Sequence, residues 1–231
     1  MNPPSSQALM RAIETLYSLN ALNSEGAITS QGKLLAELPL EPQLAKCVLT
    51  SPLYMCVPEI LTIVAMLSVP SVFTRSTTSR KGLARNEDEF VDDDEQTFID
   101  RNEDSMKLFA DPESDHITLL NMYELSFFLI NSYNAYQRVR EEDKMAWCQV
   151  HSLNHRNLNA AYDIREQLCN LIDRMHLPVN SNIVMSSIEK KRNIKKCLTH
   201  GFFMQSAIFD HDGNYLTAKD NQVYACSEDL L

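Results

Sequence analysis

The chain has 231 residues, of which 44% are hydrophobic, and a formal net charge of -10. This length and apolar content allow a buried core, which excludes a wholly disordered chain. The negative balance alone argues against a nucleic-acid partner, but the acidic residues concentrate between Glu87 and Glu113, so the net charge hides basic surface elsewhere.

Cysteine usage and the apolar runs bear on the cellular compartment. The six cysteines include no CxxC pair, and the sequence shows neither a signal peptide nor an Asn-x-Ser/Thr sequon. This pattern indicates a reduced, intracellular setting in which thiols are buried as hydrophobic groups. The longest apolar run, residues 60–72, is interrupted by polar residues and is too short to cross a bilayer. We therefore expect a soluble protein without disulfides and without a membrane partner.

The first 51 residues predict a helix, a short hairpin and a second helix. Ser5 or Ser6 can cap the first helix, whose apolar residues recur at helical spacing. These residues are Ala8, Leu9, Ala12, Ile13, Leu16 and Leu19. A turn over 24–26 separates two apolar pieces, and the second helix, over 30–36, ends before a proline. This order is typical of a winged-helix module.

Winged-helix modules often bind DNA through a basic recognition helix. Here only Arg11, Lys33 and Lys46 are basic. The composition therefore disfavours DNA recognition and favours a role in packing against protein.

The composition of residues 52–113 changes twice, from apolar to basic and then to acidic. Pro58 and Glu59 start a predicted helix that is apolar on nearly every side, as in a central core helix of an all-α domain. Residues 74–113 are first basic and then acidic, with few apolar side chains, which predicts a mobile insertion. A calcium loop is the alternative, but the glycine and the carboxylate spacing of an EF-hand are missing.

The stretch from Trp147 to Met175 carries the clearest helical pattern. It follows a helix predicted from an Asp115 N-cap to Ile130 and a polar break around residues 140–144. Its apolar residues share one face, which we expect to be buried, and Leu177-Pro178 ends it. That face comprises Ala161, Ile164, Leu168, Leu171 and Met175.

The last 50 residues combine a basic helix with strands. After a connector over 181–187, residues 188–200 predict an amphipathic helix with Gly201 as its cap. Turns around residues 210–214 and 219–221 then separate three β-type segments. Two β-hairpins are predicted.

Motifs that carry enzyme chemistry are missing from the sequence. It contains no GxxxxGK[ST] phosphate loop, no GxSxG elbow and no HExxH or CxxC site. Cys148, His151 and His155 have the spacing of a zinc site if their segment is helical, but a fourth ligand is not evident and packed histidines are commoner. We expect no catalytic residue, no metal and no cofactor in this chain.

Six blocks resemble, in the same order, the C-terminal half of the DEAH-box RNA helicases. They are NPPSSQALMRAIETLYSLNAL, GAITSQGKLLAELPLEPQLAKCVL, CVPEILTIVAMLSVPSVF, DHITLLNMY, WCQVHSLNHRNLNAAYDIREQL and GFFMQSA. Within the family, LNHRNL and AAYDIREQL are most similar to the spliceosome-disassembly member, which also serves ribosome assembly.

The resemblance implies a mainly α fold with a small β part. A winged-helix domain is expected over 1–51, and a helical-bundle ratchet-like domain over 52–186 with residues 74–113 as its acidic insertion. Residues 187–231 would be the start of an OB-fold, truncated because about thirty β residues cannot close a five-stranded barrel.

The resemblance also implies a function. In these helicases ATP and Mg²⁺ bind to N-terminal helicase domains, and the C-terminal domains form part of a single-stranded RNA tunnel and dock G-patch-type activators. The expected partners are therefore RNA, the N-terminal helicase domains of the same protein, a G-patch-type activator and spliceosomal proteins, in the nucleus.

The matching blocks supply the candidate RNA-facing residues. They are His116, Thr118, Asn121, Asn154, Arg156 and Asn157. Amides and hydroxyls can bind phosphate or sugar without reading sequence. The alternative is structural: Asn154 and Asn157 cap a helix, and His116 packs internally. Two other functions stay open, a protein-interaction scaffold that binds G-patch or spliceosomal proteins without RNA, and a winged-helix DNA-binding regulator.

Overall fold

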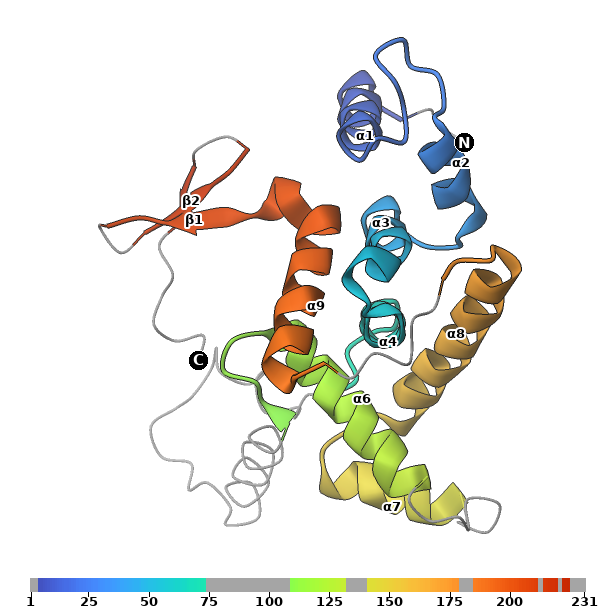
Figure 1. The fold of residues 1–231 in the computed structure, drawn as a ribbon. Coiled ribbons are helices and arrows are strands. Elements are labelled where there is room, and N and C mark those ends of the chain that lie inside the picture. The colour runs from blue at the N-terminus through green and yellow to red at the C-terminus, as the bar shows by residue number, and fades with distance from the viewer. Residues whose placement is uncertain are drawn as a thin grey trace. The chain divides into compact units, whose positions relative to one another are not determined.

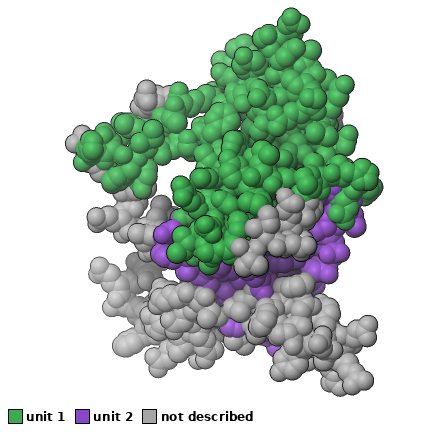
Figure 2. Space-filling view, in the orientation of Figure 1, with its two compact units in different colours: residues 1–60, 173–231 green, residues 61–172 purple. Residues whose placement is uncertain are grey.

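The computed structural model describes residues 4–73, 109–131, 141–178, 185–211, 214–219 and 222–224. In this part the protein is mainly helical with one small sheet, which confirms the predicted fold class (Figure 1). The chain divides into two compact units, residues 1–60 with 173–231 and residues 61–172 (Figure 2). The domain boundaries expected after residues 51 and 186 stay a prediction.

The N-terminal helices of the first unit form as their caps predict. Helix α1 (Ser6–Ser18) begins after Ser5, whose Oγ accepts a hydrogen bond from the Ala8 amide at 3.2 Å. Helix α2 (Ser30–Glu37) begins after Thr29, which caps it through the Gly32 amide. A bridge between Leu22 and Ile28 joins the two short apolar pieces. The predicted order of helix, hairpin and helix is therefore confirmed.

Helices α3 (Pro42–Thr50) and α9 (Ser187–Phe202) pack along each other in the first unit (Figure 1). A short 3₁₀ helix, η1 (Ser51–Tyr54), follows α3. The sequence predicted α9 nearly at its observed bounds, but α3 was not predicted. Gly201 lies inside α9 and does not cap it, which corrects the prediction. A Cβ at Gly201 would overlap Cys47 Sγ and the Gln43 carbonyl, so glycine is needed for the close approach of the two helices.

Three short strands follow η3 (Phe203–Gln205). They are β1 (Ala207–Phe209), β2 (Tyr215–Thr217) and β3 (Val223–Tyr224), and they pair antiparallel in the order β1-β2-β3. Phe209 faces Tyr215 across the first pair, and Leu216 faces Val223 across the second. The two predicted hairpins are confirmed, whereas the OB-fold stays a prediction.

Helix α4 (Val57–Leu67) is buried along most of its length, as predicted for a core helix. Its C-terminal end contributes Met66 to the core of the second unit. The other buried members of that core are Val72, Phe109, Met122, Tyr123, Cys148, Leu153, Leu158 and Ala161. Residues 74–108, most of the predicted mobile insertion, lie outside the described residues. Phe109, near the end of that stretch, is 1% exposed and belongs to this core, and the insertion itself stays a prediction.

In the described part of the second unit three further helices follow α4, and their bounds correct the sequence prediction. Helix α6 (Asp115–Asn131) includes Asp115, and the preceding Ser114 carbonyl accepts the first helical bond, from the Thr118 amide at 3.0 Å. Helix α7 (Glu141–Val150) covers most of the predicted polar break at 140–144. Helix α8 (His155–Arg174) starts only after a turn, so Trp147–Met175 is not one helix.

The turn between α7 and α8 is a Schellman motif, which explains why the sequence predicted one continuous helix where the structure has two. Ser152 has a left-handed backbone with φ of 54°, and its amide donates to the Gln149 carbonyl at 3.2 Å. The Leu153 amide donates to the Cys148 carbonyl at 2.7 Å. A serine carries little sequence signal for this conformation, which glycine usually adopts. No helix among the described residues is long and apolar enough to span a membrane.

Candidate functional site

All six candidate residues lie in the second unit, in two groups. His116, Thr118 and Asn121 are on the first two turns of α6. Asn154, Arg156 and Asn157 are at the start of α8. Side chains of the first group bond to residues 109–114, and the Asn157 side chain of the second group bonds to the loop after α4.

The α6 group holds the segment that precedes the helix. Thr118 Oγ1 accepts a hydrogen bond from the Asp111 amide at 2.8 Å and donates to the Ser114 carbonyl at 3.3 Å. Asn121 Nδ2 donates to the Phe109 carbonyl at 3.2 Å. Because Phe109 is in the core, these bonds tie the segment to the unit's interior. Two of the predicted RNA contacts therefore have a structural role.

His116 differs from its two neighbours because its ring is partly buried and titratable. Burial lowers the pKa of His116, and the adjacent Asp115 carboxylate opposes this effect only in part. Burial therefore favours the neutral form of the ring. A neutral imidazole can donate and accept one hydrogen bond each, but it adds no positive charge to a phosphate site.

The α8 group begins with a helix cap. Asn154 Oδ1 accepts a hydrogen bond from the Asn157 amide at 3.2 Å, and the Asn154 amide donates to the Val72 carbonyl at 2.7 Å. The structural alternative is thus confirmed for Asn154. Asn157 does not cap the helix: its Nδ2 donates to the carbonyls of Ser71 at 2.8 Å and Pro70 at 3.3 Å. Both residues fasten the loop after α4.

Arg156 lies between these two asparagines and is exposed. The first turn of α8 contains no acidic residue. A cation at a helix N-terminus is disfavoured by the macrodipole, so the charge of Arg156 does not stabilise α8 through the dipole. The exposed guanidinium adds positive charge at the N-terminal end of α8, where the helix dipole is also positive, and such an end suits an anion.

The structure describes all three residues of the zinc alternative, Cys148, His151 and His155. Cys148 is buried in the core, and burial raises the pKa of its thiol to about 11. The His151 ring packs against Trp147, with centroids 4.6 Å apart, and edge-on to Phe109. Among the residues that the structure describes, no group of three or more histidine, cysteine, aspartate or glutamate side chains could hold a metal ion.

A second feature, a groove on α1, was not predicted. The groove has a volume of about 920 Å³ and lies between one side of α1 and the hairpin loop, residues 22–26. Its apolar lining includes Met10, Ile13 and Tyr17, and no residue of α1 is buried. The amphipathic pattern of this helix could have revealed an apolar face but not that the face is uncovered.

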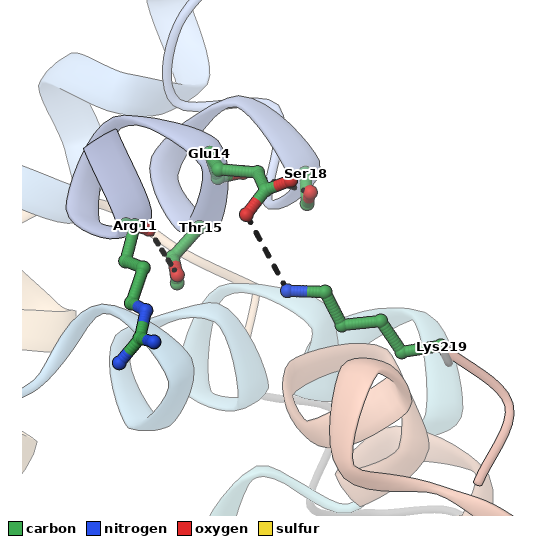
Figure 3. Close-up of polar contacts among 5 residues, drawn as sticks. All are labelled: Arg11, Glu14, Thr15, Ser18 and Lys219. Atoms are coloured by element: carbon green, nitrogen blue, oxygen red, sulfur yellow. Dashed lines mark hydrogen bonds and ion pairs between the residues drawn. The ribbon is translucent and has the colours of Figure 1, made fainter. Parts of the chain in front are cut away.

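Charged residues border this groove. Arg11 and Glu14 are among the lining residues. Lys219, which follows β2, lies with its Nζ 3.4 Å from Glu14 Oε2 (Figure 3). Both side chains of this ion pair are about half exposed, so it contributes little to stability. The arrangement is an apolar trough with a polar rim, as in surfaces that accept a helix.

Comparison with known proteins places these features in a family context. The model described as helicase associated domain (HA2), winged-helix, matches residues 12–40, and the model described as helicase associated domain (HA2), ratchet-like, matches residues 41–119. The pre-mRNA-splicing factor ATP-dependent RNA helicase prp22 of Schizosaccharomyces pombe is 34% identical over 222 residues. The alignment covers 96% of this chain and 16% of that relative, so the chain spans about a sixth of the relative's length.

Proposed function

We propose that this chain, which carries the winged-helix and ratchet-like helicase-associated domains, is the non-catalytic C-terminal segment of an ATP-dependent DEAH-box RNA helicase. The observation that carries the proposal is the 34% identity to an RNA helicase across 96% of the chain. ATP and Mg²⁺ would bind to helicase domains elsewhere in the parent protein. The relative is named as a pre-mRNA-splicing factor, which supports ribonucleoprotein remodelling in the nucleus, with ribosome assembly as a further setting.

In this proposal the second unit supplies part of the wall of the single-stranded RNA tunnel. Arg156 contacts phosphate, and His116 offers an uncharged hydrogen bond to phosphate or sugar. Thr118, Asn121 and Asn157 act by positioning, since their side chains hold the loops beside the core. Such contacts would grip the backbone without reading base sequence, as a motor that translocates along RNA requires.

The partners are proposed from the same segment. The N-terminal helicase domains of the parent would pack on the chain, and a G-patch-type activator or spliceosomal protein would use the α1 groove. Exposed Met10, Ile13 and Tyr17 offer apolar anchors at helical spacing. A partner helix with a complementary apolar face fits such a surface.

Fluorescence anisotropy of a labelled oligouridine tests the RNA contact. Binding should weaken steeply as salt rises, because each phosphate contact releases counterions. Arg156→Ala should weaken binding by about 1 kcal/mol, roughly five-fold. Arg174→Ala, which removes an exposed arginine from the other end of α8, is the matched control and should bind like the unsubstituted protein. Equal affinity of the two variants would disprove the Arg156 contact.

The second candidate function is a protein-interaction scaffold that does not contact RNA. The specific observation in its favour is the uncovered apolar side of α1, where Met10 is 67% exposed and Tyr17 is 52% exposed. If the chain fails to bind oligouridine even at low salt but binds a G-patch peptide, and Met10→Ser with Ile13→Ser abolishes that binding, the scaffold is the better assignment.

A further inference from the structure

Helix α9 presents a basic face that the candidate site does not include. Arg192 and Lys196 are exposed one helical turn apart, and the half-buried Lys191 and Lys195 flank them. In an α-helix, residues three and four positions apart are neighbours, so these four cations form one patch. The patch is conspicuous in a chain whose net charge is -10.

The opposite face of α9 is firmly anchored within the first unit. Ile194, Cys197 and Leu198 are buried, and the Cys197 thiol lies 3.2 Å from the Cys47 carbonyl of α3. The first turn of α9 is closed by a capping box between Ser186 and Glu189. The patch is therefore carried by a rigid helix whose rotation is set by packing.

The neighbouring Lys190 does not belong to the patch. Its Nζ forms an ion pair with Glu59 Oε1 at 2.6 Å, and the Glu59 side chain is only 10% exposed. The charge of Lys190 is therefore paired with a carboxylate within the first unit. Lys190 therefore fastens α9 within the unit, whereas the exposed Arg192 and Lys196 lie on the outer side of the helix.

We propose that the outer face of α9, defined by Lys191, Arg192, Lys195 and Lys196, is a second contact for the phosphate backbone of single-stranded RNA. The proposal rests on the RNA-binding function proposed above and adds a surface on the other compact unit. The Arg192 guanidinium can pair with a phosphate through two hydrogen bonds, and the lysines add point charges. These contacts carry no base specificity.

The composition of the face favours a nucleic-acid strand over an acidic amphipathic helix. A helical partner needs apolar anchors that recur at three- and four-residue spacing. The outer face offers one exposed apolar side chain, Ile188, and continues with Thr199 beyond the cations. The face can therefore recognise a partner mainly through charge. A nucleic-acid backbone carries a negative phosphate at every nucleotide and so complements the cations along its whole length.

Anisotropy titrations with labelled oligouridine over a series of salt concentrations test the proposal. The test variant is Arg192→Gln with Lys196→Gln. Lys33→Gln with Arg174→Gln is the control, since it removes two exposed cations from elsewhere and gives the same net charge. The test variant should lose affinity on the order of ten-fold at low salt. The slope of log affinity against log salt should fall by about 1.4, which is two contacts at about 0.7 each.

Three other results would contradict the α9 contact, and each can be told apart from the others. If both double variants keep the slope of the unsubstituted chain, the α9 contact is wrong, although the Arg156 contact can still hold. If the unsubstituted chain shows no salt-dependent binding at all, the proposed function fails and the α9 contact fails with it. If oligouridine binding is unchanged but binding of polyglutamate is lost in the test variant, the face serves an acidic protein and the proposal is overturned.

Discussion

Asn157 and Arg156 are adjacent in sequence and use their side chains differently. The side-chain amide of Asn157 donates to two carbonyls of the loop after α4, one of them 86 residues away in sequence. Arg156 projects from the same turn and is exposed. The family resemblance suggested a common role in RNA contact for both, whereas the fold gives the Asn157 side chain a partner inside the protein.

Asn157→Ala should destabilise the second unit. The substitution leaves the Ser71 and Pro70 carbonyls without the amide donor, and because these bonds are exposed to solvent the loss costs about 0.5–1.5 kcal/mol. Urea denaturation followed by circular dichroism measures the change in free energy of unfolding. Asn159→Ala, on the exposed side of the same helix, is the control and should change it by less than about 0.5 kcal/mol. Equal effects would contradict the positioning role of Asn157.

His151 should make stability depend on pH. Burial lowers its pKa in the folded state below the ordinary value of 6.5. Among the residues that the structure describes, its buried Nδ1 has no hydrogen-bond partner. Below pH 6.5 the unfolded chain therefore binds the proton more readily than the folded one, and the free energy of unfolding falls as the pH decreases. Above that pH the effect disappears.

Thermal unfolding between pH 7.5 and 5 measures this effect. In His151→Phe the loss of melting temperature on acidification should be smaller than in the unsubstituted chain, because the phenyl ring keeps the contacts with Trp147 and Phe109 without titrating. His116 contributes in the same direction, so part of the dependence should persist. His211→Gln, a histidine substitution at an exposed position, is the control variant. An identical profile in His151→Phe would refute the assignment.

At the scale of elements, the contact between α3 and α9 depends on one glycine. Gly201→Ala places a Cβ against the Gln43 carbonyl and the Cys47 sulfur, and a backbone carbonyl cannot move aside cheaply. We expect a loss of about 1–3 kcal/mol in the free energy of unfolding, measured in urea. Thr199→Ala, at an exposed position two residues earlier, should have a much smaller effect. A neutral Gly201→Ala would mean that the helices can separate without cost.

The break between α7 and α8 is the second feature at the scale of secondary-structure elements. Periodicity continues across residues 151–154, so the pattern alone predicts one long helix. The Schellman bonds of Ser152 and Leu153, and the cap formed by Asn154, redirect the chain. The start of α8 thereby lies beside the loop after α4, which positions Arg156 at the unit's edge.

At the scale of the whole molecule, the cysteines report on folding in both units. Cys47, Cys56 and Cys197 are buried in the first unit and Cys148 in the second, whereas Cys169 is partly exposed. Burial raises the pKa of Cys47 to about 12, which leaves almost no thiolate at neutral pH. The described cysteines are all free thiols.

Among the five cysteines that the structure describes, alkylation with iodoacetamide, read by peptide mass spectrometry, should therefore modify Cys169 first. The four buried thiols should react only when the surrounding unit unfolds, because the reagent needs an accessible thiolate. Adding denaturant should make their rates similar to that of Cys169. Fast native modification of Cys47 or Cys197 would show that α3 and α9 are not packed as described.

Local signals in the sequence determined most of the helices and the two hairpins. Ser5, the apolar run after Pro58, and the basic pattern before Gly201 each specify an element through neighbours within a few residues. Such signals act on the backbone directly, so they survive without knowledge of the fold. The family blocks likewise identified a helicase-associated segment, which the matches to family models and to prp22 support.

Only the tertiary structure decided how the polar candidates are used and why Gly201 is needed. Asn157 and Asn121 find their acceptors 86 and 12 residues away in sequence, and Gly201 meets a helix from the other end of the chain. Distances of this kind depend on packing, because a side chain's hydrogen-bond partner is set by which loops the core brings beside it. Arg156 and the outer face of α9 emerge as binding candidates because they remain exposed when the rest of their helices is packed.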